Sequence, residues 1–161
     1  MIRLDGSAVR VLAPIDQLYY YDVQNITLDR ELSPLEAWNL ITQHPQPLLR
    51  LAFRIRDAIS ALFGVKRIQG FSTTRVESVE IGDHLDFFLV EYTDHEALVL
   101  TERDKHLDVM TCISTAGQTV SVTSSVQVHN WFGRAYMLPV GIAHRWIVRG
   151  MLRRLQREAT R

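Results

Sequence analysis

The sequence predicts an α+β domain in which a curved antiparallel sheet of about six or seven strands is covered by a long C-terminal helix. Between Arg75 and His129, apolar runs of strand length are separated by short breaks such as Gly82-Asp83, a pattern typical of consecutive hairpins. A long amphipathic segment, Asn130 to Glu158, follows these runs. Strands and helices that are segregated along the chain favour an α+β fold over a parallel sheet.

Length and composition indicate one ordinary globular domain. The chain has 161 residues, of which 47% are apolar and 22% charged, with a net charge of zero. No global field therefore attracts nucleic acid or an acidic membrane, and we expect neither as a partner. Cys112 is the single cysteine and cannot form an internal disulfide, which predicts a cytoplasmic location. We interpret residues 1–16, which have no signal-peptide core, as an N-terminal extension and 17–161 as the domain.

The N-terminal half predicts one strand followed by two shorter helices. Residues 18–28 are rich in aromatic and β-branched side chains, which suit a strand. Ser33, Pro34 and Glu36 form a capping-box pattern that predicts a helix ending near residue 44. Apolar side chains at helical spacing predict a second helix within residues 48–63.

Five strands are predicted after these helices, at residues 75–80, 84–92, 96–103, 106–114 and 119–129. In the last strand valines alternate with hydroxyl-bearing side chains, which predicts one buried face and one solvent-facing side. In residues 84–92 both faces carry apolar groups, which predicts either two covering layers or a homodimer interface.

The C-terminal helix has an apolar side and a ladder of arginines. Val140, Trp146 and Ile147 share the predicted inner side, and Pro139 is expected to kink or restart the helix. The arginines recur every four residues, at positions 145, 149, 153, 157 and 161. Because residues 77–108 hold ten carboxylates, we expect most of the ladder to be solvated and paired within the molecule.

A tripeptide, His-Leu-Asp, occurs twice, at residues 84–86 and 106–108. On a strand, its imidazole and carboxylate point to the same face. If the two copies were neighbours, they could supply four metal ligands. The simpler interpretation is that these residues bond to turn backbone, and we predict no metal and no cofactor.

Five short motifs stand out within about residues 20–155, at residues 54–57, 106–108, 124–130, 133–136 and 139–145. Together they resemble the pattern of the DUF2867 family of uncharacterised bacterial proteins. It includes only the second His-Leu-Asp copy. The resemblance implies the helix-grip fold of the START/Bet v 1-like (SRPBCC) superfamily, with a cavity between sheet and helix, and implies no known activity. The chain has no glycine-rich dinucleotide motif, so nicotinamide chemistry is not expected.

We therefore expect the protein to enclose a small, mostly apolar molecule in that cavity. The ligand-binding candidates are Arg56, His106, His129, His144, Tyr136 and Trp146. Two alternatives remain open. One is an enzyme of the same fold, of cyclase, hydratase or lyase type, that uses His129 or His144 as acid-base catalysts. The other is a homodimeric interaction module that has no ligand.

Overall fold

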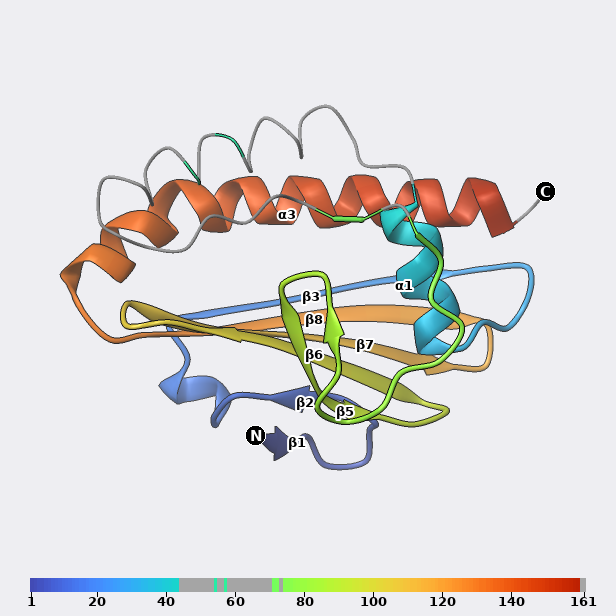
Figure 1. Cartoon of the computed structure of the whole chain (residues 1–161), viewed down its shortest axis with the longest axis horizontal. Coiled ribbons are helices and arrows are strands. Elements are labelled where there is room, and N and C mark those ends of the chain that lie inside the picture. Colours follow the sequence, from blue (N-terminus) through green and yellow to red (C-terminus); the bar gives the residue numbers. More distant parts are fainter. Residues whose placement is uncertain (44–53, 55–56, 58–70, 73, 160–161) are drawn as a thin grey trace.

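 The computed structural model describes residues 1–43, 54, 57, 71–72 and 74–159 of the chain. The second predicted helix, within residues 48–63, and the candidate Arg56 lie outside them. In the described part the fold is α+β, as predicted: a six-stranded antiparallel sheet lies under a long C-terminal helix (Figure 1). In spatial order the strands are β3 (Tyr20–Thr27), β8 (Thr119–Val128), β7 (Leu107–Ala116), β6 (Ala97–Arg103), β5 (Phe88–Thr93) and β4 (His84–Leu85).

The sheet is a meander that the first strand of the chain extends at one edge. Strands β4 to β8 pair in chain order, and β3 pairs with β8 along its whole length, from Tyr20 opposite Val126 to Thr27 opposite Thr119. In the centre, Thr111 of β7 lies opposite Ser124 of β8. The predicted breaks at residues 93–94, 104–105 and 116–117 all coincide with the turns that join β5 to β8, although Thr93 and Ala116 are still the last residues of β5 and β7.

Two strand predictions are wrong. Residues 75–80 form no strand, because the backbone of Val76 bonds to a side chain instead: its N–H donates to Asn39 Oδ1 at 3.0 Å and its carbonyl accepts from Asn39 Nδ2 at 2.8 Å. Residues 84–92 are not one strand but the hairpin of β4 and β5. Asp86 turns the chain with a φ of 57°, a conformation that aspartate adopts more readily than most side chains.

The predicted capping box begins α1 (Pro34–Thr42). Ser33 Oγ accepts from the Glu36 N–H at 3.3 Å, and the Glu36 carboxylate accepts from the Ser33 N–H at 2.9 Å. The helix buries Trp38 and Ile41 in the main core, where they pack with apolar side chains of β5 and β6. α1 therefore closes one end of the space above the sheet (Figure 1).

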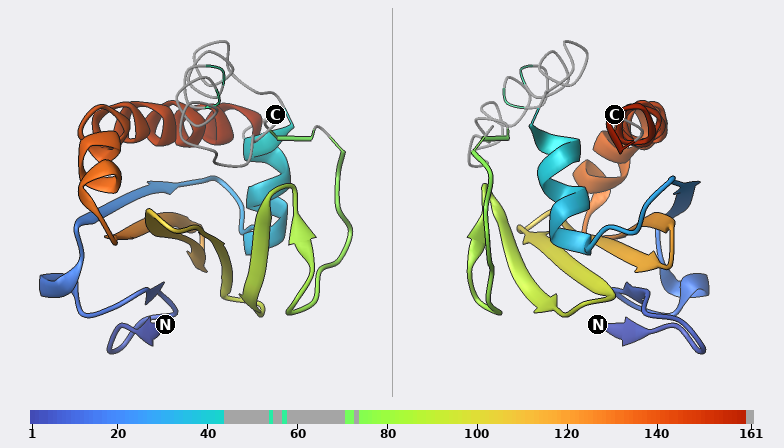
Figure 2. Two further views of the ribbon diagram at one scale, coloured as in Figure 1. Left: turned by 60° about the vertical axis from the view of Figure 1, so that its left-hand side comes forward. Right: turned by 90° about the vertical axis from the view of Figure 1, so that its right-hand side faces the viewer.

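The C-terminal helix α3 (Trp131–Ala159) spans 29 residues with Pro139 inside it. Its first turns run at an angle to the rest (Figure 2), which agrees with the kink predicted at the proline. Val148, Leu152 and Leu155 anchor its C-terminal half in the main core. Among the described residues, no helix is both long and apolar enough to cross a membrane.

The N-terminal residues pack against the sheet face opposite α3 (Figure 2). They comprise β1 (Ile2–Arg3), β2 (Arg10–Val11) and the 3-10 turn η1 (Ile15–Gln17). Leu12 packs in a second core with Val99, Met110 and Cys112. The Leu12 N–H donates to Ser125 Oγ at 3.2 Å. The prediction that this side of residues 119–129 faces solvent is therefore wrong, because an N-terminal layer covers it.

Candidate functional site

A cavity of about 280 Å³ lies between the sheet and α3. Its floor is formed by the inward-facing residues of β7 and β8, and its roof by α3 between Phe132 and Leu152. The floor residues are Leu107, Val109, Thr111, Ile113, Val122, Ser124 and Val126. This is the place at which the resemblance to a known family implied a cavity.

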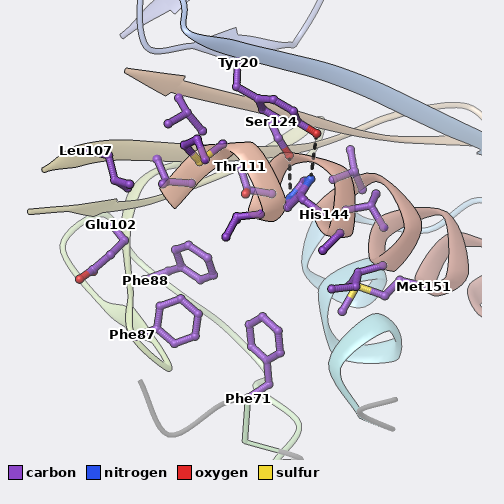
Figure 3. Close-up of a pocket in the computed structure, with 18 of the residues that line it drawn as sticks. Tyr20, Phe71, Phe87, Phe88, Glu102, Leu107, Thr111, Ser124, His144 and Met151 are labelled. Atoms are coloured by element: carbon purple, nitrogen blue, oxygen red, sulfur yellow. Dashed lines mark hydrogen bonds between the residues drawn. The ribbon is translucent and has the colours of Figure 1, made fainter. Parts of the chain in front are cut away.

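One wall of the cavity is aromatic (Figure 3). Phe87 lies in the turn between β4 and β5, and Phe88 is the first residue of β5. Trp38 comes from α1, and Phe71 from the segment before β4. The Trp38 ring meets Phe71 and Phe88 edge-on, with centroids 5.3 and 6.0 Å apart. The rings of Phe87 and Phe88 lie 4.3 Å apart. Such a wall offers an apolar, aromatic surface, against which a ligand needs few polar groups.

A polar group of three side chains, Tyr20, Ser124 and His144, lies at the cavity surface (Figure 3). His144 Nδ1 is 3.4 Å from the Tyr20 hydroxyl, and Nε2 is 3.4 Å from Ser124 Oγ. The Tyr20 hydroxyl also lies 3.2 Å from the Gly141 carbonyl, which can only accept. If the single Tyr20 proton goes to that carbonyl, Nδ1 of His144 must donate to Tyr20, and Nε2 then accepts from Ser124.

Burial shifts the pKa values of two of these side chains, His144 and Tyr20. Desolvation lowers the pKa of His144, a shift that neighbouring Arg145 reinforces and Asp22 opposes. Desolvation likewise raises the pKa of Tyr20, together with the negative charge of Asp22. Both side chains are therefore neutral near pH 7, and they present hydrogen-bonding groups without net charge.

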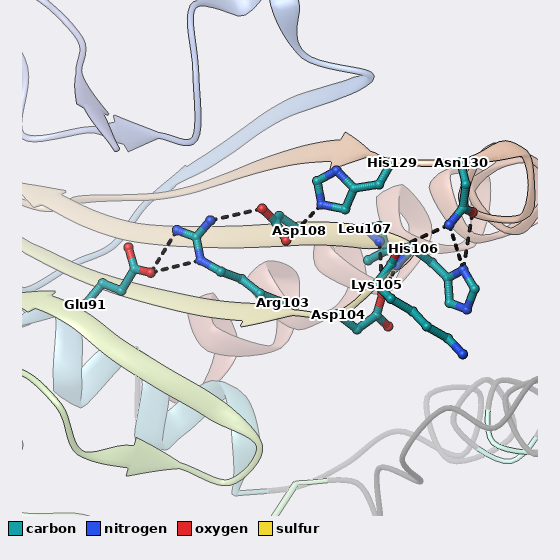
Figure 4. A network of polar contacts seen from close by, with 9 residues as sticks. All are labelled: Glu91, Arg103, Asp104, Lys105, His106, Leu107, Asp108, His129 and Asn130. Atoms are coloured by element: carbon teal, nitrogen blue, oxygen red, sulfur yellow. Dashed lines mark hydrogen bonds and ion pairs between the residues drawn. The ribbon is translucent and has the colours of Figure 1, made fainter.

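His106 is a second polar side chain at the cavity. Its Nδ1 lies 3.2 Å from Asn130 Oδ1 and 3.0 Å from Asn130 Nδ2 (Figure 4). The centroid of its ring lies 4.5 Å from that of Phe132. Its Nε2 is buried and has no hydrogen-bond partner. Buried polar atoms are seldom left unpaired in folded proteins, so this nitrogen is a natural contact for a polar ligand atom.

The predicted site residues divide between the two sides of the sheet. His106, Tyr136 and His144 line the cavity. His129 does not: its Nε2 lies 3.1 Å from Asp108 Oδ1, and Asp108 points away from the cavity because its neighbours Leu107 and Val109 point into it. The fold therefore does not bring His129 and His144 together.

Trp146 is also placed differently from the prediction. Its side chain is 66% exposed and lies outside the cavity lining, although Ile147 beside it is buried. The angle between successive helical residues is about 100°, so the kinked helix turns Ile147 inward and Trp146 outward.

The two His-Leu-Asp copies lie on different strands that are not neighbours, β4 and β7. Asp86 accepts from the Ser72 N–H at 2.8 Å. Asp108 instead accepts from Arg103 at 3.0 Å, within a chain of polar contacts that runs from Glu91 through Arg103 and Asp108 to His129 (Figure 4). No group of metal-ligand side chains occurs in the part of the chain that the structure describes.

Sequence reasoning missed Tyr20 and Ser124 as site residues. Ser124 interrupts the inward-facing valines of β8, between Val122 and Val126. A polar residue in the buried phase of an alternating strand is a signal that could have identified it. Tyr20 carries no comparable signal, because its approach to His144 depends on how α3 lies across β3.

A comparison with models of known protein families shows to which family the chain belongs. The family model described as "Protein of unknown function (DUF2867)" matches residues 14–151. The chain belongs to the DUF2867 family. The match confirms the family resemblance seen in the sequence, and it spans the six-stranded sheet and α3 as far as Met151. Comparisons with curated proteins and with solved structures gave no significant match.

Proposed function

We propose that this DUF2867 protein binds a small, mostly apolar molecule in the cavity between the sheet and α3, in a helix-grip arrangement. The observation that carries the proposal is the cavity itself, about 280 Å³ in volume and lined mainly by apolar side chains. Ligand sites are typically apolar hollows with a few fixed polar groups, and this volume is at the small end of their usual range of about 300–1,000 Å³.

The polar groups of the cavity specify the kind of ligand. Tyr20, Ser124 and His144 bond to one another at the longest distances of a hydrogen bond, 3.4 Å for each contact to His144. A ligand hydroxyl or carbonyl could replace either contact with a shorter one. Since burial lowers the pKa of His144 and keeps it neutral near pH 7, it would meet the ligand as an uncharged hydrogen-bonding group.

The first test is mass spectrometry of the purified protein under native and denaturing conditions. A bound organic mass that disappears on denaturation is the expected result, and it would supply the ligand. A parallel assay uses Nile red, an uncharged apolar dye whose fluorescence rises in a dry cavity. We expect saturable binding of one dye molecule, with displacement by the recovered ligand.

A matched pair of variants ties binding to the cavity. Val122→Phe places a larger side chain in the cavity floor, where Val122 is 7% exposed, and should weaken Nile red binding at least about tenfold. Val23→Phe makes the same change on β3, where the side chain is 43% exposed and outside the cavity lining. Equal binding by both variants would contradict the proposal.

A second candidate function, an enzyme that uses His144 as an acid-base catalyst, is favoured by one observation. The neutral His144 ring lies between two hydroxyl groups inside an apolar cavity, an arrangement suited to moving a proton. The ligand recovered from the protein, incubated with fresh enzyme, should then be converted at a rate that His144→Gln reduces at least about a hundredfold. Unchanged ligand after long incubation would leave binding as the function.

A further inference from the structure

The outer face of α3 exposes four large apolar side chains. Trp131 is 73% exposed, Leu138 67%, and Ile142 and Trp146 66% each. Their spacing of seven, four and four residues places them on one side of the helix. Isolated exposed apolar residues are ordinary, but a continuous row along one helix marks an interaction surface.

The same face becomes basic toward the C-terminus. Arg149, Arg153 and Arg157 are exposed and continue the row at four-residue spacing. Over its whole length α3 has six arginines and a single carboxylate, Glu158, which lies 3.7 Å from Arg154. Arg145 is paired with Asp22 of β3 at 3.3 Å. The expectation that the arginine ladder pairs within the molecule is thus met in the described contacts at Arg145.

We propose that this outer face of α3 docks on an anionic lipid surface. Tryptophan is the side chain that most favours the boundary between headgroups and acyl chains, and two of the four exposed apolar residues, Trp131 and Trp146, are tryptophans. Arginines beside them would meet lipid phosphates. A helix with an apolar row and only basic charge beside it is the pattern of interfacial helices. The zero net charge of the chain conceals this local asymmetry.

A second copy of the chain fits the surface less well. A stable interface buries about 800 Å² on each partner. Four side chains along one helix expose less, since a fully enclosed aromatic side chain buries only about 150–250 Å². A lipid surface needs no such area, because headgroups adapt around a single helix.

The surface also lies directly behind the cavity. Tyr136, Val140 and Ala143 of the same helix segment line the cavity, so docking would hold the cavity against the lipid boundary. The proposal does not depend on ligand binding, and its test can succeed when that of the cavity fails.

The test is co-sedimentation of the whole chain with vesicles of phosphatidylcholine, alone or mixed with phosphatidylglycerol. We expect binding to the mixed vesicles that is at least about fivefold weaker on phosphatidylcholine alone, the effect of one arginine at an anionic surface. The emission of Trp131 and Trp146 should shift to shorter wavelength on binding, whereas Trp38, 6% exposed, is already shielded.

Paired variants locate the surface. Leu138→Ser with Ile142→Ser should reduce binding at least about tenfold, whereas Ile81→Ser, at a side chain 65% exposed elsewhere, should leave it unchanged. Arg149→Gln with Arg153→Gln should remove the preference for phosphatidylglycerol. Three results would overturn the proposal: no binding to either vesicle, binding that the α3 variants do not change, or a dimer in sedimentation that the Leu138 and Ile142 changes abolish.

Discussion

His144 shows how the fold sets the chemistry of a single residue. The sequence predicts that this histidine lies on the C-terminal helix. The structure places its ring at the cavity, between the hydroxyl groups of Tyr20 and Ser124. Burial lowers its pKa, so the folded protein holds the neutral form in a pH range where an unfolded chain would take up a proton.

This shift makes stability depend on pH. The unfolded histidine has a pKa of about 6.5, and the pKa of folded His144 lies below its ordinary value. The resulting stability is fully present above about pH 6.5 and is lost as the pH falls from there through the folded pKa. Urea unfolding between about pH 7 and about pH 5 should therefore show a smaller loss of stability for His144→Gln than for the natural sequence.

The control for this prediction is His95→Gln. His95 is exposed at the β5–β6 turn, so its replacement removes a histidine that lies outside the cavity. If His144→Gln and His95→Gln gave the same slope, burial of His144 would not be the source of the dependence.

Gly133 illustrates a contact that only the fold reveals. A Cβ on this residue would lie 2.5 Å from the His106 carbonyl oxygen, which is main chain and cannot move aside. In a free helix Gly→Ala gains about 1 kcal/mol. Here we expect Gly133→Ala to lower the free energy of unfolding by about 1–3 kcal/mol, measured by urea titration.

Ala135→Gly, on the exposed side of the same turn, provides the comparison. It should cost about 1 kcal/mol through helix propensity alone. A stabilised Gly133→Ala protein would show that the start of α3 can move away from β7.

At the scale of elements, the N-terminal layer completes the core. The sequence interpretation treated residues 1–16 as an extension outside the domain, but Leu12 is 8% exposed and packs on Val99, Met110 and Cys112. The layer also covers Cys112, whose pKa is raised by burial.

Removing one anchor of this layer should loosen it. Leu12→Ala should cost about 2–3 kcal/mol and accelerate the reaction of Cys112 with Ellman's reagent. Ile15→Ala, at a side chain 46% exposed, should do neither. An unreactive Cys112 together with unchanged stability in Leu12→Ala would mean that the layer contributes little to the core.

The helix α3 carries apolar side chains on two of its sides. Its inner side chains, such as Ile147 and Leu152, are buried against the sheet and α1. The outer row of Trp131, Leu138, Ile142 and Trp146 is exposed. A helix that is apolar on both sides needs a second apolar environment, which is the origin of the lipid-surface proposal.

At the scale of the whole molecule, the cavity is a packing defect that the fold maintains. Protein interiors are usually close-packed, and a hollow of about 280 Å³ lowers stability unless a ligand occupies it. Pressure favours the unfolded state in proportion to such internal volume.

Filling the cavity should therefore reduce sensitivity to pressure. Val122→Phe should make the volume change of unfolding less negative, as measured by the fluorescence of the chain under hydrostatic pressure. Val23→Phe, outside the cavity, should match the natural sequence. The same volume change in all three proteins would indicate that the cavity collapses in solution.

The sequence by itself determined the class of fold and most of its elements. Alternation and turn residues gave β6, β7 and β8 to within about two residues, and the Ser33 capping box gave α1. These features are local, since a strand's period or a cap depends on residues a few positions apart. For the same reason the hairpin at Asp86 was missed, because its turn lies within a run that is apolar on both sides.

Only the tertiary structure decided which residues share a site. The sequence pattern suggested that His129 and His144 share a site. Because side chains alternate along β7, however, Asp108 points to the side of the sheet away from the cavity, and His129 contacts Asp108 there. It also could not show that Tyr20, at the start of β3, meets His144 on α3, a contact between residues 124 positions apart. Such contacts follow from strand pairing and from the path of α3 over the sheet, which depend on the whole chain at once.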